Sequence, residues 1–263
     1  VSGEWIGAIA MTEPDTGSDL KAIRTSALRQ GDKFVLNGSK TYITNGMSSD
    51  FVIVAAKTGP AAGAKGVSLL IVDADMPGFE RGRHLDKIGQ HSSDTAELFF
   101  RDVEVPQANL LGTEGQGFIY LMSQLPQERL AVSIEAHAAA QRAFDEALEF
   151  TKTRKAFGKP VFDFQNTRFQ LARMATELQV GWAHLDWALT EQVAGRLTPE
   201  QAAAVKLWHT ELQGRVTDSA LQMFGGAGYM NEYLIAQLYR DARVTRIYGG
   251  TSEIMCEVIG RSL

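Results

Sequence analysis

Two patterns of hydrophobic and polar positions follow one another along the chain. From Trp5 to about Pro106, short apolar or alternating runs are separated by glycines and polar turns. This pattern predicts β-strands, because side chains along a strand point alternately to its two faces. Asn-Gly and Pro-Gly turns between the runs predict an antiparallel barrel or sandwich. The runs are Trp5 to Met11, Lys33 to Thr44, Phe51 to Lys57, Gly66 to Asp73 and Ala96 to Val105.

After the stretch from Gly112 to Phe118 the apolar spacing becomes helical. Apolar side chains from Leu130 to Leu148 recur on broadly one side of a helix. Further helices are predicted at Asp163 to Gly195, Pro199 to Phe224, Glu232 to Val244 and Thr251 to Arg261. The sequence therefore predicts an α+β, two-domain fold: a β-barrel or sandwich over residues 1–111, then an up-and-down four-helix bundle over residues 112–263.

Composition removes several classes of function. The chain has 263 residues, is 44% hydrophobic and carries a formal net charge of -5, with both signs scattered. It has no basic stripe of the kind that binds a nucleic-acid backbone. No apolar run approaches the roughly 20 residues that cross a bilayer. The single cysteine, Cys256, cannot form an intrachain disulfide, which favours a reducing compartment and more often indicates packing than chemistry.

Common catalytic and metal-binding motifs are absent from the sequence. It contains no phosphate-binding GxxxxGK[ST], no GxGxxG between a strand and a helix, no HExxH and no GxSxG. We interpret the scattered histidines as surface or hydrogen-bonded residues, and we expect no metal site. They are His84, His91, His137, His184 and His209.

Two clusters in the β region have the residue types of a binding site. Thr12 to Leu20, TEPDTGSDL, combines hydroxyls, acidic groups and backbone amides directly after a strand. Gly38 to Gly46, GSKTYITNG, places Tyr42 between Thr41 and Thr44, so a ring could stack on it while hydroxyls bind the ring edge. A plain turn and a half-exposed strand are the alternatives.

Three more clusters lie in the helical region. In TRKAFGKP, Arg154 could pair with a diphosphate and Phe157 could lie beside an adenine, although a simple helix end explains the same residues. QMFGGAGY contains the pair Gly225-Gly226, which allows backbone to approach a ligand. RIYGGTSEIM, residues 246–255, places two more glycines before a helix.

Taken together and in order, these clusters resemble the acyl-CoA dehydrogenase family across nearly the whole chain. The matching motifs are TEPDTGSD, KTYITNG, SSDTAELFF, ERLA, TRKAFGKPVFDFQ, QMFGGAGYMNEY and RDARVTRIYGGTSEI. The resemblance implies a middle β-barrel domain and a C-terminal four-helix bundle, preceded by an N-terminal helical domain that this chain lacks. The wording of LPQERL and IYGGTSEIM is closest to the long-chain type.

The resemblance implies FAD as cofactor, bound between barrel and bundle and completed by a neighbouring subunit. It places Tyr42 and Thr44 beside the isoalloxazine, and Arg154, Phe157 and Gln165 on the diphosphate and adenosine of the adjoining subunit's cofactor. The full cofactor-binding set is Met11, Thr12, Gly17, Ser18, Tyr42, Thr44, Arg154, Phe157, Gln165, Gln222, Gly226, Thr251 and Glu253. The substrate-binding set is Ser18, Arg129, Tyr248 and Gly249.

The reaction implied is α,β-dehydrogenation of an acyl-CoA thioester to the trans-2-enoyl-CoA, which requires a base across from the flavin. Much of the family has a glutamate where this chain has Gly249, so the usual base is missing. A long-chain and isovaleryl subset takes its base from a bundle helix, within a motif that reads LPQERLA here, and on that match Glu128 is the base. The alternative is that Glu128 and Arg129 form the solvated first turn of a helix after Pro126. The backbone N–H of Gly249 is expected to bind the thioester carbonyl.

The resemblance also implies partners and a location. It predicts a homotetramer that passes electrons to electron-transfer flavoprotein, in a bacterial cytoplasm or a mitochondrial matrix, with any targeting region outside this chain. Two alternatives remain open: a catalytically silent flavin-binding or assembly subunit, and a related flavin oxidase that uses oxygen. A chain without either carboxylate would fit the silent subunit, whereas this chain has Glu128.

Overall fold

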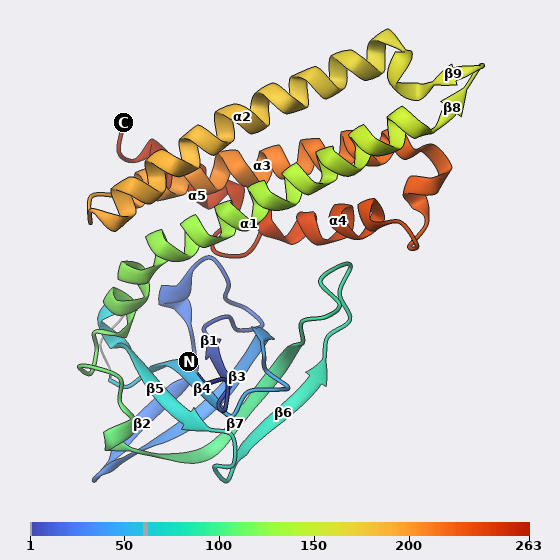
Figure 1. Ribbon diagram of the computed structural model, residues 1–263. Helices are drawn as coiled ribbons and strands as arrows, with labels where there is room; N and C mark the ends of the chain where they lie inside the picture. Colours follow the sequence, from blue (N-terminus) through green and yellow to red (C-terminus); the bar gives the residue numbers. More distant parts are fainter. Residues whose placement is uncertain (1, 60–62) are drawn as a thin grey trace. The chain divides into compact units, whose positions relative to one another are not determined.

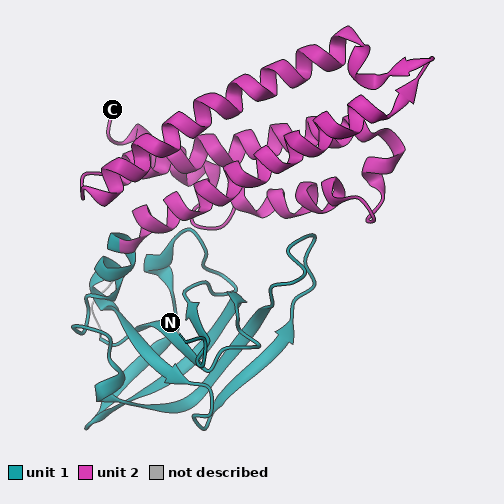
Figure 2. Ribbon diagram, viewed as in Figure 1, with its two compact units in different colours: residues 1–123 teal, residues 124–263 magenta. Residues whose placement is uncertain are grey.

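The computed structural model describes residues 2–59 and 63–263. Contacts divide the chain into two compact units, residues 1–123 and 124–263 (Figure 2). The division lies within a helix, because α1 (Gly117–Thr153) begins in the first unit and continues into the second. The predicted domain boundary after residue 111 stays a prediction. It rests on the change from a strand pattern to a helix pattern in the sequence, and that change marks where the strands end.

The first unit is built on a curled sheet of seven strands (Figure 1). The strands are β1 (Gly7–Ala10), β2 (Ser26–Gln30), β3 (Lys33–Thr44), β4 (Phe51–Lys57), β5 (Val67–Asp73), β6 (Phe79–His84) and β7 (Thr95–Pro106). Their order is β1-β4-β2-β3-β7-β6, with β5 paired to β4. A strand-built unit followed by a helical one confirms the predicted fold class.

The sheet differs from the prediction in one respect, because it is mixed. β1 runs parallel to β4 from Gly7↔Phe51 to Ala10↔Val54, and β2 touches β4 in parallel at Ser26↔Lys57. The other pairings, β2–β3, β3–β7, β4–β5 and β6–β7, are antiparallel. β1 reaches β4 after a long excursion through β2 and β3, so no tight hairpin forces the two strands to be antiparallel.

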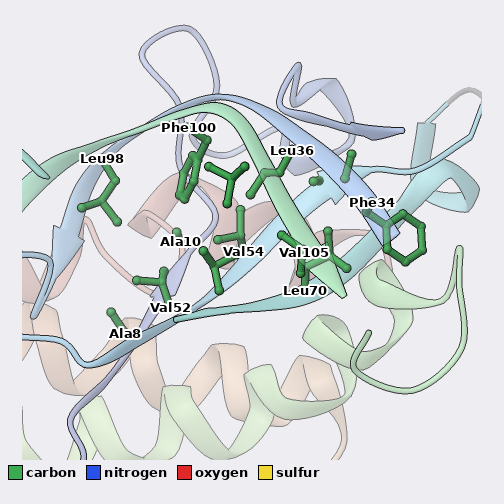
Figure 3. Packing of buried hydrophobic residues seen from close by; sticks show 14 of the residues in the cluster. Ala8, Ala10, Phe34, Leu36, Val52, Val54, Leu70, Leu98, Phe100 and Val105 are labelled. Carbon is green, nitrogen blue, oxygen red and sulfur yellow. The ribbon is translucent and has the colours of Figure 1, made fainter. Parts of the chain in front are cut away.

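The curl of the sheet encloses one hydrophobic core. Side chains from facing strands meet there, as Figure 3 shows for Leu36, Val54, Leu98 and Phe100. Along β3 and β7 the core positions alternate with half-buried or exposed ones, which is the period-two pattern that predicted the strands. Burying such side chains stabilises the unit by roughly 1.5–3 kcal/mol each.

The second unit is a bundle of long helices with two short ones. The long helices are α1, α2 (Gln165–Val193) and α3 (Pro199–Phe224), and the short ones are α4 (Leu234–Ala242) and α5 (Ser252–Gly260). A hairpin of β8 (Lys155–Ala156) and β9 (Lys159–Pro160) joins α1 to α2. None of the helices in the described ranges is both long and apolar enough to cross a membrane.

Small side chains let the long helices approach closely. Ala140, Ala143 and Ala147 of α1 are buried against Leu178 of α2 and Leu212 of α3. The start of α3 carries a complete capping box: the hydroxyl of Thr198 accepts from the Gln201 N–H, and the Gln201 side chain accepts from the Thr198 N–H. The helix therefore begins where the sequence predicts, directly after Thr198.

Candidate active site

A buried ion pair fixes the TEPD loop to the sheet. Lys40 Nζ lies 2.9 Å from Glu13 Oε1 and donates to the Met11 carbonyl at 3.0 Å. The Glu13 carboxylate also accepts the backbone N–H groups of Arg24, at 2.6 Å, and Thr25, at 3.0 Å. Burial opposes the charge of Glu13, but these hydrogen bonds outweigh burial and lower its pKa. The loop is therefore anchored inside the sheet by the Glu13–Lys40 pair.

This anchoring of the loop brings two of the predicted flavin-binding segments together. The Thr12 carbonyl accepts the Thr41 N–H at 3.0 Å, so the loop lies against β3 next to Tyr42. Tyr42 is 70% exposed and has a φ of 59° at a bulge in the β3–β7 pairing. A large exposed side chain held in the left-handed region is strained, and such strain concentrates at functional sites. Thr44 is exposed on the same strand.

The predicted loop glycine and serine are open to solvent. Gly17 and Ser18 are exposed, and a Cβ built on Gly17 would meet no atom within 4 Å. The loop closes through a pair of backbone hydrogen bonds between Glu13 and Thr16. Its tip therefore leaves backbone exposed to solvent, and the contact of Gly17 and Ser18 with a ligand stays a prediction.

A second group of predicted cofactor residues gathers at one end of the bundle. Phe157, in the turn of the β8–β9 hairpin, is 95% exposed with a φ of 51°. Arg154 and Gln165 flank the hairpin, and both are exposed. Phe150 of α1 stacks on Phe224 of α3 with ring centroids 4.1 Å apart, so the end of α3 lies at the same end of the bundle. Gln222 and Gly226, beside Phe224, are exposed too.

A third group surrounds the IYGGT turn, where two buried cations hold the glycine carbonyls. Arg129 of α1 is 6% exposed, and its Nε donates to the Gly249 carbonyl at 3.4 Å. Lys206 of α3 is 0% exposed, and its Nζ donates to the Gly250 carbonyl at 2.6 Å. Both glycines have positive φ, 63° for Gly249 and 99° for Gly250. Within the described residues, the N–H groups of these two glycines have no hydrogen-bond acceptor.

Glu128 is the neighbour of Arg129 on α1 and is exposed at the surface of its unit. Even so, the protein around the carboxyl partly desolvates it and raises its pKa, while the charge of Arg129 opposes the rise. α1 begins at Gly117, so Glu128 lies beyond the first turn and Pro126 is inside the helix. The interpretation of Glu128 and Arg129 as a solvated first turn is therefore wrong.

The remaining predicted residues flank the turn. The Tyr248 hydroxyl donates to Glu135 of α1 at 3.5 Å. Thr251 caps α5, with its hydroxyl accepting the Ile254 N–H at 3.3 Å. Hydrogen bonds to its own backbone N–H and to Thr251 lower the pKa of Glu253, which is exposed in the first turn of α5. An ionised carboxylate is favourable at a helix N-terminus.

The turn group and the hairpin group lie far apart. They are separated by α1 from Glu128 to Thr153. At about 1.5 Å per residue, this length of helix spans about 38 Å. A single dinucleotide does not reach over that distance, so the two groups of one chain cannot contact the same cofactor molecule.

Comparison with known proteins decides which family has this arrangement. Residues 8–103 match the family model described as acyl-CoA dehydrogenase, middle domain, and residues 115–263 match acyl-CoA dehydrogenase, C-terminal domain. The mitochondrial long-chain specific acyl-CoA dehydrogenase of Sus scrofa is 49% identical over 264 aligned positions, which cover 100% of this chain. The chain belongs to the acyl-CoA dehydrogenase family.

Solved acyl-CoA dehydrogenases have the same fold. The enzyme from Geobacillus kaustophilus superposes with a TM-score of 0.97 at 50% identity, covering 99% of this chain and 69% of that one. A glutaryl-CoA dehydrogenase from Mycobacterium smegmatis, solved in complex with FADH2, superposes with a TM-score of 0.93 at 30% identity. The superposition covers 99% of this chain and 66% of that one. The chain spans 61% of the length of the pig protein.

Some residues of this member of the acyl-CoA dehydrogenase family were not predicted from the sequence. Lys206, Glu13 and Lys40 act as buried anchors. The sequence signal for Lys206 was a lysine among apolar helix neighbours, VKLWH, and for Lys40 it was a lysine at an inward position of a strand. The histidine interpretation holds only in part for two residues, which are hydrogen-bonded at one ring nitrogen and, within the described ranges, not at the other. His137 and His209 are fully buried, their Nδ1 atoms are 3.2 Å apart, and both Nε2 atoms have no partner among the described residues.

Proposed function

We propose that the protein dehydrogenates the α,β bond of an acyl-CoA thioester, giving the trans-2-enoyl-CoA. The observation that carries the proposal is the contact between Arg129 and the Gly249 carbonyl, because it brings the helix position of Glu128 against the glycine turn. Family membership supports the activity, and the turn offers backbone donors next to a carboxylate of raised pKa. These are the parts needed to remove a proton beside a thioester.

The residues present fit FAD. Exposed, strained aromatics at Tyr42 and Phe157 offer faces for stacking, and Gly17, Gly225 and Gly226 leave open space where a Cβ would stand. We infer that Met11, Thr12, Tyr42 and Thr44 hold the flavin end. Bound FAD supplies the acceptor for the hydride that leaves the β-carbon. The relative solved with FADH2 supports this choice of cofactor.

Glu128 is the proposed base, and it must be ionised to accept the α-proton. Partial burial raises its pKa, which brings its basicity closer to that of an effective catalyst near neutral pH. Substrate that excludes water would raise the pKa further. Turnover should therefore rise with pH through the pKa of Glu128. The Gly249 N–H would meanwhile stabilise negative charge on the thioester oxygen.

The separation of the two bundle groups supports an oligomer. Arg154, Phe157, Gln165, Gln222 and Gly226 would contact the cofactor of a neighbouring subunit, because they lie too far along α1 from the glycine turn. We propose a homotetramer that passes electrons to electron-transfer flavoprotein. The pig relative is described as mitochondrial and Geobacillus is a bacterium, so the mitochondrial matrix and the bacterial cytoplasm are the proposed locations.

The base is tested by Glu128→Gln in the full-length, flavin-loaded protein. Removing a general base lowers turnover roughly 10²- to 10⁴-fold, so we expect kcat to fall by that factor while flavin content is unchanged. Glu149→Gln changes an exposed carboxylate further along α1 and should leave kcat unaltered. Near-normal turnover in Glu128→Gln would rule out the assigned base.

The reaction and its acceptor are tested separately. Anaerobic mixing with acyl-CoAs of different length and branching should bleach the flavin for at least one of them. A protein that is not bleached by any of them would be the silent subunit. Hydrogen peroxide formed in air at the turnover rate would instead indicate an oxidase, whereas an acyl-CoA dehydrogenase requires an added electron acceptor.

A further inference from the structure

Lys206 occupies a position where an apolar side chain would pack without electrostatic cost. It lies on α3 among Ala202, Ala203 and Val205, all buried, and is itself fully buried. Removing an ammonium group from water costs several kcal/mol unless hydrogen bonds and charges compensate. Burial lowers its pKa to about 8, with repulsion from Arg129 adding to the effect and Glu211 opposing it. The free-energy cost of burying this ammonium group indicates that Lys206 has a role that an apolar side chain could not fill.

The hydrogen bonds of Lys206 show what that role is. Among the described residues, its Nζ makes one hydrogen bond, to the Gly250 carbonyl at 2.6 Å. Further along α3, Glu211 accepts from Ser252 Oγ at 2.7 Å and pairs with Arg246 at 3.3 Å. α3 thus holds the segment around the glycine turn at three points: the Gly250 carbonyl through Lys206, and Ser252 and Arg246 through Glu211.

The geometry of the peptide group turns this hold into an orientation. The peptide bonds of the turn are trans, so each N–H points opposite to the carbonyl of the residue before it. Because the Gly249 and Gly250 carbonyls point to buried cations, the N–H groups of Gly250 and Thr251 point away from them. The Gly249 N–H joins this fixed segment directly, through the Gly249 Cα, so the hold limits its direction as well. A carbonyl bonded to a cation also polarises its own peptide group and strengthens the N–H as a donor. Glycine alone gives this turn no fixed shape, because it adopts many backbone conformations.

We propose that Lys206 is a positioning residue, which, with Arg129, locks the Gly249–Gly250 turn and so fixes the direction in which the adjoining Gly249 N–H is presented to the thioester carbonyl. This rests on the proposed function, since it concerns the carbonyl-binding donors of that site. Lys206 does not contact the substrate itself. It acts through the backbone, by removing the freedom of two adjacent glycines before substrate arrives.

The test measures recognition of the carbonyl, without turnover. Two ligands are titrated into the full-length, flavin-loaded protein: trans-2-hexadecenoyl-CoA, and the thioether of the same carbon skeleton with CH2 in place of the carbonyl. The wild type should bind the thioester roughly tenfold or more tightly than the thioether. Lys206→Met should keep the thioether affinity and lose most of that preference. Lys206→Arg, which keeps the charge, should restore part of it.

A matched control separates positioning from general weakening of α3. Thr217→Val alters another buried polar side chain of α3, whose hydroxyl bonds, within the part of the chain that the structure describes, only to backbone carbonyls of the same helix. It should retain the full thioester preference. If Lys206→Met does not fold, Lys206→Gln is titrated instead. Its neutral amide is one atom shorter than the lysine chain, so we expect a loss of preference of about threefold or more.

The outcomes distinguish carbonyl recognition by the turn from the positioning role of Lys206. A wild type that binds thioester and thioether equally would overturn carbonyl recognition by the turn, and with it the proposed function of Gly249. A wild type with a clear preference, together with a Lys206 variant of equal preference, would overturn the positioning role alone. Loss of preference in Thr217→Val as well would also overturn it, because any disturbance of α3 would then suffice.

Discussion

At the scale of single residues, the Glu13–Lys40 pair shows how a surface loop is held by charges inside a sheet. Both side chains are nearly inaccessible, and the carboxylate also accepts two backbone N–H groups. Such a pair is costly to break, because removing one partner leaves the other charge buried and alone. The loop that carries Met11, Thr12 and Gly17 depends on that pair.

Lys40→Met should lower the free energy of unfolding by about 3–5 kcal/mol, because it leaves the Glu13 carboxylate without its cation. Adding Glu13→Gln removes the unpaired charge and should recover part of that loss. Urea unfolding of the wild type, Lys40→Met, Glu13→Gln and the double variant measures both effects. A double variant whose loss equals the sum of the single losses would show that the two charges do not interact.

Gly249 offers a second test at this scale, since the residue could carry a carboxylate. A Cβ built there lies 3.5 Å from Lys206 Cε, an ordinary contact, although its φ of 63° costs an L-residue about 1–2 kcal/mol. In the Glu128→Gln background, Gly249→Glu should restore measurable turnover. Gly250→Glu is the control and should not, because a φ of 99° disfavours any side chain there and its Cβ would lie 2.6 Å from Cε of the buried Met255, which would have to move. Turnover no higher than in Glu128→Gln alone would argue against residue 249 as a second base position.

At the scale of elements, the β8–β9 hairpin holds Phe157 in a conformation that stability alone does not favour. The ring is almost wholly exposed and its only close aromatic neighbour among the described residues is Phe164, with ring centroids 6.2 Å apart. An exposed phenylalanine at positive φ has an unfavourable backbone conformation, and it buries too little apolar area to offset that cost.

Phe157→Gly should therefore leave the unfolding free energy of the protein unchanged or raise it by a few tenths of a kcal/mol. We expect FAD affinity to fall about tenfold, because the proposed adenosine contact is lost. Thermal unfolding without added FAD and fluorescence titration of the flavin measure the two effects. Unchanged FAD affinity would remove Phe157 from the cofactor site.

The elements also show how far the sequence pattern reaches. β3, β4 and α3 have the bounds that periodicity and the Thr198 cap predicted. β2 and β6 were not predicted, because SALRQ and FERGRH are short and mostly polar, with few buried side chains to produce an alternating pattern. Such strands are specified by their hydrogen-bonded neighbours, which a local pattern does not contain.

At the scale of the whole molecule, the bundle brings together three histidines from three helices, two of them fully buried and one half-buried. His137 of α1, His184 of α2 and His209 of α3 lie together, with the His184 and His209 rings stacked at 5.3 Å. Burial, together with repulsion from the other two, lowers the pKa of His209 to about 3. Burial lowers the pKa of His137 and His184 as well. The folded protein therefore keeps this cluster neutral.

The cluster predicts sensitivity to acid. An unfolded histidine has a pKa of about 6.5, so below that pH the unfolded chain binds protons that the folded chain excludes, and stability falls as pH falls. For His209 alone the loss is about 2 kcal/mol at pH 5. Urea unfolding at pH 7 and pH 5 should show a smaller loss in His209→Leu than in the wild type. His84→Gln, which alters an exposed histidine, should behave as the wild type does.

The candidate site could be predicted only where its chemistry lies in local motifs. Glu128, Gly249 and the loop residues were found because their clusters resemble a family, and their catalytic and binding roles stay predictions. Lys206 and His209 were not found, because their importance arises from residues more than forty positions away that meet them in the folded bundle. Hydrophobic periodicity treats such residues as exceptions on a buried face.

The exposed, left-handed aromatics have a consequence for protein engineering. Tyr42 and Phe157 are positions where glycine or asparagine would relieve strain, so a design procedure that selects for thermostability would replace both. The redesigned protein would melt at a higher temperature and, on our assignment, lose its hold on both ends of the cofactor. Any thermostable version intended as a catalyst should keep these two side chains fixed from the start.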